Sequence, residues 1–136
     1  MTIQNLSLLI SDKISRRKIL QKFSLLNKFY AKDALEREKI IFNRLAYTLK
    51  NAYESIPYYY DLAEKYDLKD IFLNFTIDKL KDIPPICKDT LKSQKKFFLK
   101  PDITDDLKYC FTNGSTGGRV SIAYNKEAID WSSAVT

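Results

Sequence analysis

The chain has 136 residues, 45% of them hydrophobic and 29% charged, which suffices for one domain with a modest core and excludes a disordered protein. It contains no histidine and two cysteines, which excludes a histidine-based catalytic triad and the usual zinc-binding motifs. The net charge of +6 belongs to residues 1–32, where seven Lys or Arg accompany one Asp. The remaining residues carry 16 basic and 16 acidic side chains, without the basic excess of a nucleic-acid-binding domain.

The N-terminus has a short apolar patch at residues 6–10 with no basic region before it, unlike a secretory signal. No apolar run is long enough to span a membrane. Two lone cysteines, Cys87 and Cys110, indicate a reducing compartment, so we expect a cytoplasmic protein. Because no base neighbours Cys110, we interpret it as a core residue rather than a nucleophile.

Residues 12–31 are predicted to form the first helix, with Ser11 as its N-cap. One interpretation is that an apolar face packs on the body of the protein while the Lys and Arg side chains lie in water. The other is that this basic amphipathic segment lies on an anionic membrane surface. The apolar face has helical spacing and consists of Ile19, Phe23, Leu26 and Tyr30.

A second helix is predicted over residues 33–54, with Asp33 as its cap. Pro57 then fixes the start of a shorter helix over residues 58–66. The rings of residues 58–60 could form a stacking platform for bases, but we favour a helix start with partly buried rings. The apolar stripe of the second helix consists of Ile41, Leu45, Leu49 and Tyr53.

Shorter elements follow. Thr76 can cap a brief helix through Leu80, and residues 83–86, Ile-Pro-Pro-Ile, must be extended because a residue before proline avoids the α region. Residues 88–93 can form another short helix, and a loop surrounds Pro101. Lys95-Lys96 is expected to be a solvated turn.

Two strands are predicted near the C-terminus, a buried one over residues 107–112 and another over residues 120–124. Asn125 can cap a last helix that begins at Lys126. The predicted fold class is therefore α/β, with a helical N-terminal half followed by the first strands of a larger sheet.

All three glycines of the chain, Gly114, Gly117 and Gly118, lie between these strands. A hairpin turn would need glycine for positive φ angles. A phosphate cradle would need it so that backbone N–H groups can approach an anion, with hydroxyls from Thr112, Ser115 and Thr116 and a charge from Arg119. The two interpretations are compatible. The spacing matches neither the P-loop nor the dinucleotide-binding fingerprint.

A third pattern does match. Residues 112–117, TNGSTG, resemble the T-S-G-[ST]-T-G phosphate loop of adenylate-forming enzymes. Residues 55–59, SIPYY, and residues 80–91, LKDIPPICKDTL, are similar to elements of the phenylacetate–CoA ligase branch, which includes proteins of capsular polysaccharide biosynthesis. Residues 121–131, SIAYNKEAIDW, are similar to the strand, turn and helix that follow the loop in that branch. The resemblance covers about residues 33–136.

This resemblance implies that residues 33–136 are the N-terminal fragment of an adenylate-forming domain, preceded by the basic segment 1–32. Such enzymes use ATP with magnesium to convert a carboxylic acid to an acyl-adenylate, and a thiol, usually coenzyme A, then takes the acyl group. The loop holds the β- and γ-phosphates while charge builds on pyrophosphate. By this resemblance the phosphate-binding residues are Thr112, Asn113, Gly114, Ser115, Thr116, Gly117 and Gly118.

The chain departs from the family pattern at Asn113, where the family usually has Ser, and at Arg119, where it usually has Pro. Family enzymes are several times longer, and their adenine contacts, magnesium-binding acid and catalytic lysine lie downstream of the loop. We therefore expect no catalysis by residues 1–136 alone, and the acyl substrate stays unassigned. The alternative function is a non-catalytic helical module that binds a partner or an anionic membrane through residues 1–32.

Overall fold

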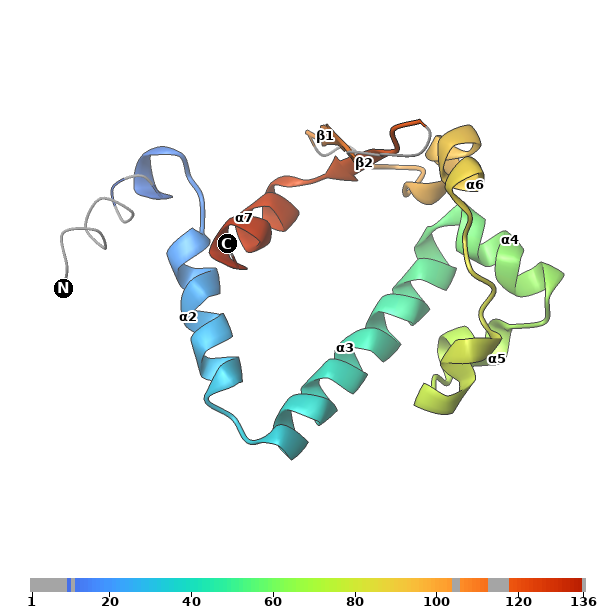
Figure 1. Ribbon diagram of the computed structural model, residues 1–136, viewed down its shortest axis with the longest axis horizontal. Coiled ribbons are helices and arrows are strands. Elements are labelled where there is room, and N and C mark those ends of the chain that lie inside the picture. The colour runs from blue at the N-terminus through green and yellow to red at the C-terminus, as the bar shows by residue number, and fades with distance from the viewer. Residues whose placement is uncertain (1–9, 11, 104–105, 113–117, 136) are drawn as a thin grey trace. The chain divides into compact units, whose positions relative to one another are not determined.

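The computed structural model describes residues 10, 12–103, 106–112 and 118–135. The described residues are mostly helical, with one small antiparallel sheet of two strands, which agrees with a mixed α and β composition (Figure 1). The larger sheet that the sequence predicted stays a prediction.

The chain divides into two compact units, which we describe separately. The terminal unit consists of Met1–Arg37, Asp105–Cys110 and Ile122–Thr136, and the central unit of Glu38–Thr104 and Phe111–Ser121. The terminal unit holds the basic N-terminal segment together with the C-terminal residues. The predicted division into residues 1–32 and an adenylate-forming fragment over residues 33–136 stays a prediction.

In the terminal unit, helix α2 (Ile19–Tyr30) packs against helix α7 (Lys126–Val135), blue and red in Figure 1. The Asn125 side chain accepts a hydrogen bond from the N–H of Ala128 at 2.9 Å, which confirms the predicted cap of α7. The predicted helix over residues 12–31 was wrong in its start: Arg16 has a φ of 51°, which interrupts the helix before α2. Ser11 lies outside the described residues.

The face of α2 that packs overlaps the predicted apolar face only in part, since Ile19 and Leu26 are partly buried. Phe23 and Tyr30 are 51% and 65% exposed, whereas the buried side chain of α2 is Lys22. Lys22 lies about a quarter-turn around the helix from the apolar stripe, at 100° per residue. The expectation that the apolar face packs and the charges lie in water holds for Ile19, Leu26 and Lys28, and it was wrong for Phe23, Tyr30 and Lys22. The physical reason is that α7 offers Lys22 a carboxylate and an aromatic ring, as described below.

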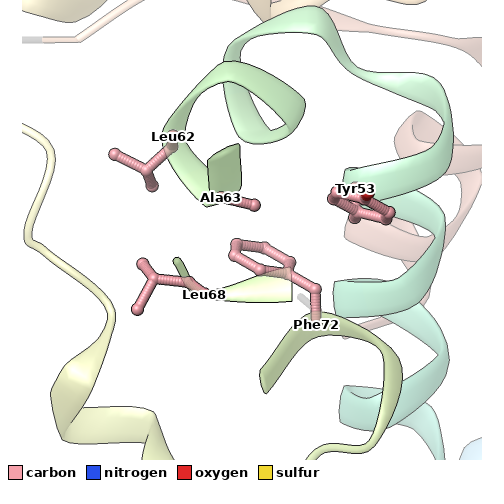
Figure 2. Packing of buried hydrophobic residues seen from close by; sticks show 5 residues of the cluster. All are labelled: Tyr53, Leu62, Ala63, Leu68 and Phe72. Atoms are coloured by element: carbon pink, nitrogen blue, oxygen red, sulfur yellow. The ribbon is translucent and has the colours of Figure 1, made fainter. Parts of the chain in front are cut away.

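Helix α3 (Ala34–Ser55) begins in the terminal unit, and most of it belongs to the central unit. There it is followed by α4 (Pro57–Lys65) and α5 (Lys69–Leu73). The N–H of Glu36 donates to Asp33 Oδ1 at 2.8 Å, so the predicted cap of α3 is confirmed. Pro57 stands in the first turn of α4, as predicted. Of the predicted stripe of α3, Tyr53 is buried, whereas Ile41 is 55% exposed. The core shown in Figure 2 consists of Tyr53, Leu62, Ala63, Leu68 and Phe72.

Three short helices follow: η1 (Ile77–Asp82), α6 (Lys88–Ser93) and η2 (Lys95–Phe98). The bounds of α6 are those predicted. Thr76 stands at the N-cap position of η1, but its side chain makes no capping hydrogen bond, contrary to the prediction. Tyr58 and Tyr59 are half-buried, and the Tyr58 ring stacks on Phe98 with centroids 4.1 Å apart, so the interpretation of partly buried rings is confirmed for these two.

Strands β1 (Lys108–Phe111) and β2 (Ser121–Tyr124) lie within the predicted ranges and pair with each other. The prediction that the first strand is buried was wrong, since all four of its residues are exposed. Cys110 is exposed as well, so its interpretation as a core residue was also wrong. A sheet of two strands buries its faces only if another layer covers them, and no described residues form such a layer over β1.

The core of the central unit is tested by truncating its fully buried ring. Phe72 is 0% exposed, so Phe72→Ala should lower the free energy of unfolding by about 3–5 kcal/mol through lost apolar contacts and a cavity. Phe97→Ala is the matched control: that ring is 49% exposed, and we expect a change within about 0.5 kcal/mol. Urea denaturation followed by circular dichroism measures both. Equal losses in the two variants would contradict the assigned core.

Candidate functional site

The segment between Thr112 and Val120 holds all three glycines and is the glycine loop. Two hydrogen bonds between Thr112 and Val120 join its ends. The Thr112 N–H donates to the Val120 carbonyl oxygen at 2.9 Å, and the Val120 N–H donates to Thr112 Oγ1 at 3.1 Å. Val120 is only 6% exposed, so one side of this junction is anchored in the protein. The Thr112 hydroxyl accepts one bond here and keeps its own O–H to donate. Thr112 and Val120 therefore hold the two ends of the loop together.

Two of the seven predicted phosphate-binding residues are described, Thr112 and Gly118. The predicted contacts of the other five fall outside the described residues and stay predictions. These five are Asn113, Gly114, Ser115, Thr116 and Gly117.

Lys92, on α6, brings a positive charge to the exit of this loop. A β-carbon placed on Gly118 would overlap the Lys92 ammonium and would lie 3.1 Å from Cε, so the lysine tip lies directly against the glycine backbone. Its ion pair with Asp89 is long, at 3.9 Å, and Asp89 is 93% exposed, so this pair holds the ammonium weakly. No sequence pattern pointed to Lys92. It is brought to the loop by tertiary packing between segments that are distant in sequence.

The SIPYY segment also lines a cavity. Ser55, Ile56 and Pro57 form part of an open pocket of about 580 Å³ within the central unit, together with Tyr53, Tyr60 and residues 100–103. Its lining is mixed, and Lys100 Nζ donates to Asn51 Oδ1 at 3.3 Å beside it. This cavity holds no set of reactive side chains to which we assign chemistry.

In the terminal unit, an ion pair joins the N-terminal segment to α7. The Arg17 guanidinium donates to Asp130 Oδ1 and to Ser133 Oγ, both at 2.8 Å, and the Lys18 N–H donates to Asp130 Oδ2 at 3.1 Å. Asp130 is 3% exposed. Burial raises the pKa of Asp130, but the Arg17 guanidinium and the Lys18 N–H outweigh it, and the pKa lies below its ordinary value. Asp130 is therefore a buried carboxylate that stays charged.

A second ion pair buries a lysine. Lys22 Nζ lies 3.0 Å from Glu127 Oε1 and 4.4 Å from the centroid of the Trp131 ring, which gives the ammonium an anion and a cation–π contact. Lys22 is 6% exposed. Its hydrogen bond holds the pKa of Glu127 below the ordinary value. Lys22 is thus unavailable to a membrane surface, and membrane binding through residues 1–32 stays a prediction that must use other side chains.

Comparison of the chain with protein-family models, curated proteins and solved structures found no match. Across residues 10, 12–103, 106–112 and 118–135, no helix combines the length and apolar character needed to cross a membrane. The same residues gather no group of His, Cys, Asp or Glu that could hold a metal ion.

The depressed pKa of Asp130 predicts a specific acid sensitivity. Protonation of a carboxylate whose pKa is lower in the folded state removes stability as pH falls below the ordinary aspartate pKa of about 3.9 toward the folded pKa. Asp130→Asn should lower the free energy of unfolding at pH 7 by up to about 3 kcal/mol, and with it the melting temperature, because Arg17 loses its counter-charge. It should also show a smaller decrease than wild type between pH 5 and pH 2.5.

Thermal melts followed by circular dichroism, with Asp61→Asn as an exposed-site control at pH 7, measure this. Parallel pH profiles for wild type and Asp130→Asn would show that the Arg17–Asp130 pair contributes nothing to stability.

Proposed function

We propose that this chain supplies the phosphate-holding loop of an ATP-dependent adenylate-forming ligase of the phenylacetate–CoA ligase and capsular polysaccharide biosynthesis type. The observation that carries the proposal is the lysine at the loop: the segment that resembles the family's phosphate loop lies between paired strands, and the Lys92 ammonium lies against its last glycine. A turn whose only task is to reverse the chain has no need of this charge.

In this proposal the chain's own groups bind and orient pyrophosphate. Backbone N–H groups of the loop donate to phosphate oxygens, which requires glycine where a β-carbon would obstruct the approach. The Thr112 hydroxyl donates from the mouth of the loop, and the Lys92 ammonium balances the charge that builds on the leaving pyrophosphate. The site at Gly118 fits this role, since side-chain volume there would displace the ammonium.

Magnesium and coenzyme A enter only through the resemblance. The described residues gather no set of metal ligands, so we assign no magnesium ligand and derive no step through the metal. No described residues are assigned to adenine, to the carboxylic acid or to the thiol. The proposed part of the reaction is the holding of the phosphates.

The lysine is tested by pyrophosphate and ATP titrations of the chain, followed through the amide signals of Gly118 and Val120. Lys92→Gln should raise the dissociation constant about tenfold, which corresponds to the loss of one charge-assisted hydrogen bond. Lys95→Gln is the matched control, because it removes the same charge from an exposed position in η2 and should change affinity less than about twofold. Equal effects of the two substitutions would show that Lys92 makes no specific contribution to pyrophosphate binding.

The glycines are tested in the same titration. Gly117→Val should abolish the shifts of the Gly118 and Val120 amides while the circular dichroism spectrum stays that of the wild type, because the β-carbon blocks the backbone cradle. Ser115→Ala should weaken binding by about two- to tenfold, since it removes one hydroxyl donor. If Gly117→Val binds pyrophosphate as wild type does, the glycines serve the turn alone and the ligase proposal fails.

A further inference from the structure

The terminal unit contains a pocket lined by basic side chains, and none of its lining residues belongs to the glycine loop. The pocket, of about 760 Å³, is lined by residues 15–18 before α2, by Lys22 of α2, by residues 106 and 108 at the start of β1, and by Asn125 and the first turns of α7. This volume lies within the range typical of small-molecule sites, about 300–1,000 Å³. Six basic side chains line the pocket: Arg16, Arg17, Lys18, Lys22, Lys108 and Lys126.

The ion pairs decide which of these charges a ligand would meet. Three acidic side chains also line the pocket, and two of them, Glu127 and Asp130, are paired with Lys22 and Arg17. Those pairs remove the repulsion that the two carboxylates would exert on an anion. They also leave four basic side chains that form no ion pair with another described residue, against the single carboxylate of Asp106.

The backbone adds to this positive potential. The first turn of α7 borders the pocket, and the N-terminus of a helix carries a partial positive charge from its unpaired N–H groups. Asn125 caps the N–H of Ala128, the third residue of α7. In the segment before α2, Arg16 has a left-handed backbone conformation, and the consecutive basic residues Arg16, Arg17 and Lys18 line the pocket.

We propose that this pocket binds a phosphate-bearing small molecule, a phosphate monoester or inorganic phosphate. The excess of about three positive charges suits a phosphate group, which carries about −1.5 to −2 at pH 7, better than a monocarboxylate. The concave shape and the size select a small ligand over a lipid surface, which is flat and would meet only the rim. The basic side chains that are unpaired among the described residues come from the segment before α2, from β1 and from α7, all within one unit.

The test is titration of the chain with inorganic phosphate at low salt, followed through the amide signals of Lys108, Lys126 and Glu127. Lys126→Gln and Lys108→Gln should each raise the dissociation constant by about three- to tenfold, because each removes a charged contact. Both side chains are exposed, so the fold should survive the changes. Lys28→Gln is the matched control: it removes an exposed charge from α2 outside the pocket and should shift affinity less than about twofold.

Two further arms separate this site from other sources of binding. Gly117→Val should leave the phosphate response of the Lys126 amide unchanged, so failure of the loop proposal does not affect this one. Vesicles containing phosphatidylserine should fail to compete with phosphate at equal headgroup concentration. Equal loss in Lys28→Gln and Lys126→Gln, no phosphate response at these amides, or preferential binding to the vesicles would each overturn the proposal.

Discussion

The interaction on which the terminal unit depends is the pairing of charges on α7 with Arg17, just before α2, and with Lys22 of α2. Lys22 and Asp130 are the buried charged residues of the described chain, and each meets its opposite charge on a segment more than 100 residues away in sequence. Burying an unpaired charge costs several kcal/mol, so these residues can be covered only in the arrangement that pairs them. That requirement sets the rotation of α2, which turns Lys22 toward α7 and leaves Phe23 and Tyr30 exposed.

The same pairing shapes the electrostatics available for function. Arg17 and Lys22 neutralise the two carboxylates of Asp130 and Glu127, and the other charges that line the pocket are mostly positive. In the central unit, the position of a charged side chain is again set by tertiary packing, but only one side chain is involved. A single lysine from α6 lies against a glycine at the end of a hairpin, in a loop whose sequence resembles a phosphate cradle. Both sites are proposed to recognise the charge of phosphate, through different residues in different units.

Local chemistry made much of the fold predictable. Asp33 and Asn125 cap the helices that they were expected to cap, Pro57 begins α4, and α6 has the expected bounds, because each depends on neighbouring residues alone. The predictions that were wrong depended on distant partners. The burial of Lys22 on α2 depends on Glu127 and Trp131 of α7. The exposure of β1, with Cys110, arises because no described residues cover that strand. For the same reason the contact between Lys92 and Gly118 could not be predicted, because the two residues are distant in sequence and meet only in the folded chain.

The most direct test of this account is the proton NMR signal of the Lys22 side chain. The chain has one tryptophan, so nuclear Overhauser contacts between lysine methylene protons and indole protons can arise only from Trp131. With Lys22 Nζ 4.4 Å from the Trp131 ring centroid, the ε-methylene protons should be shifted upfield and show nuclear Overhauser contacts to the indole protons. Glu127→Gln should weaken both effects, because it removes the carboxylate that holds the ammonium in place. Lys22 signals at the positions of a solvated lysine, without indole contacts, would contradict the paired arrangement of α2 and α7 and the basic pocket that depends on it.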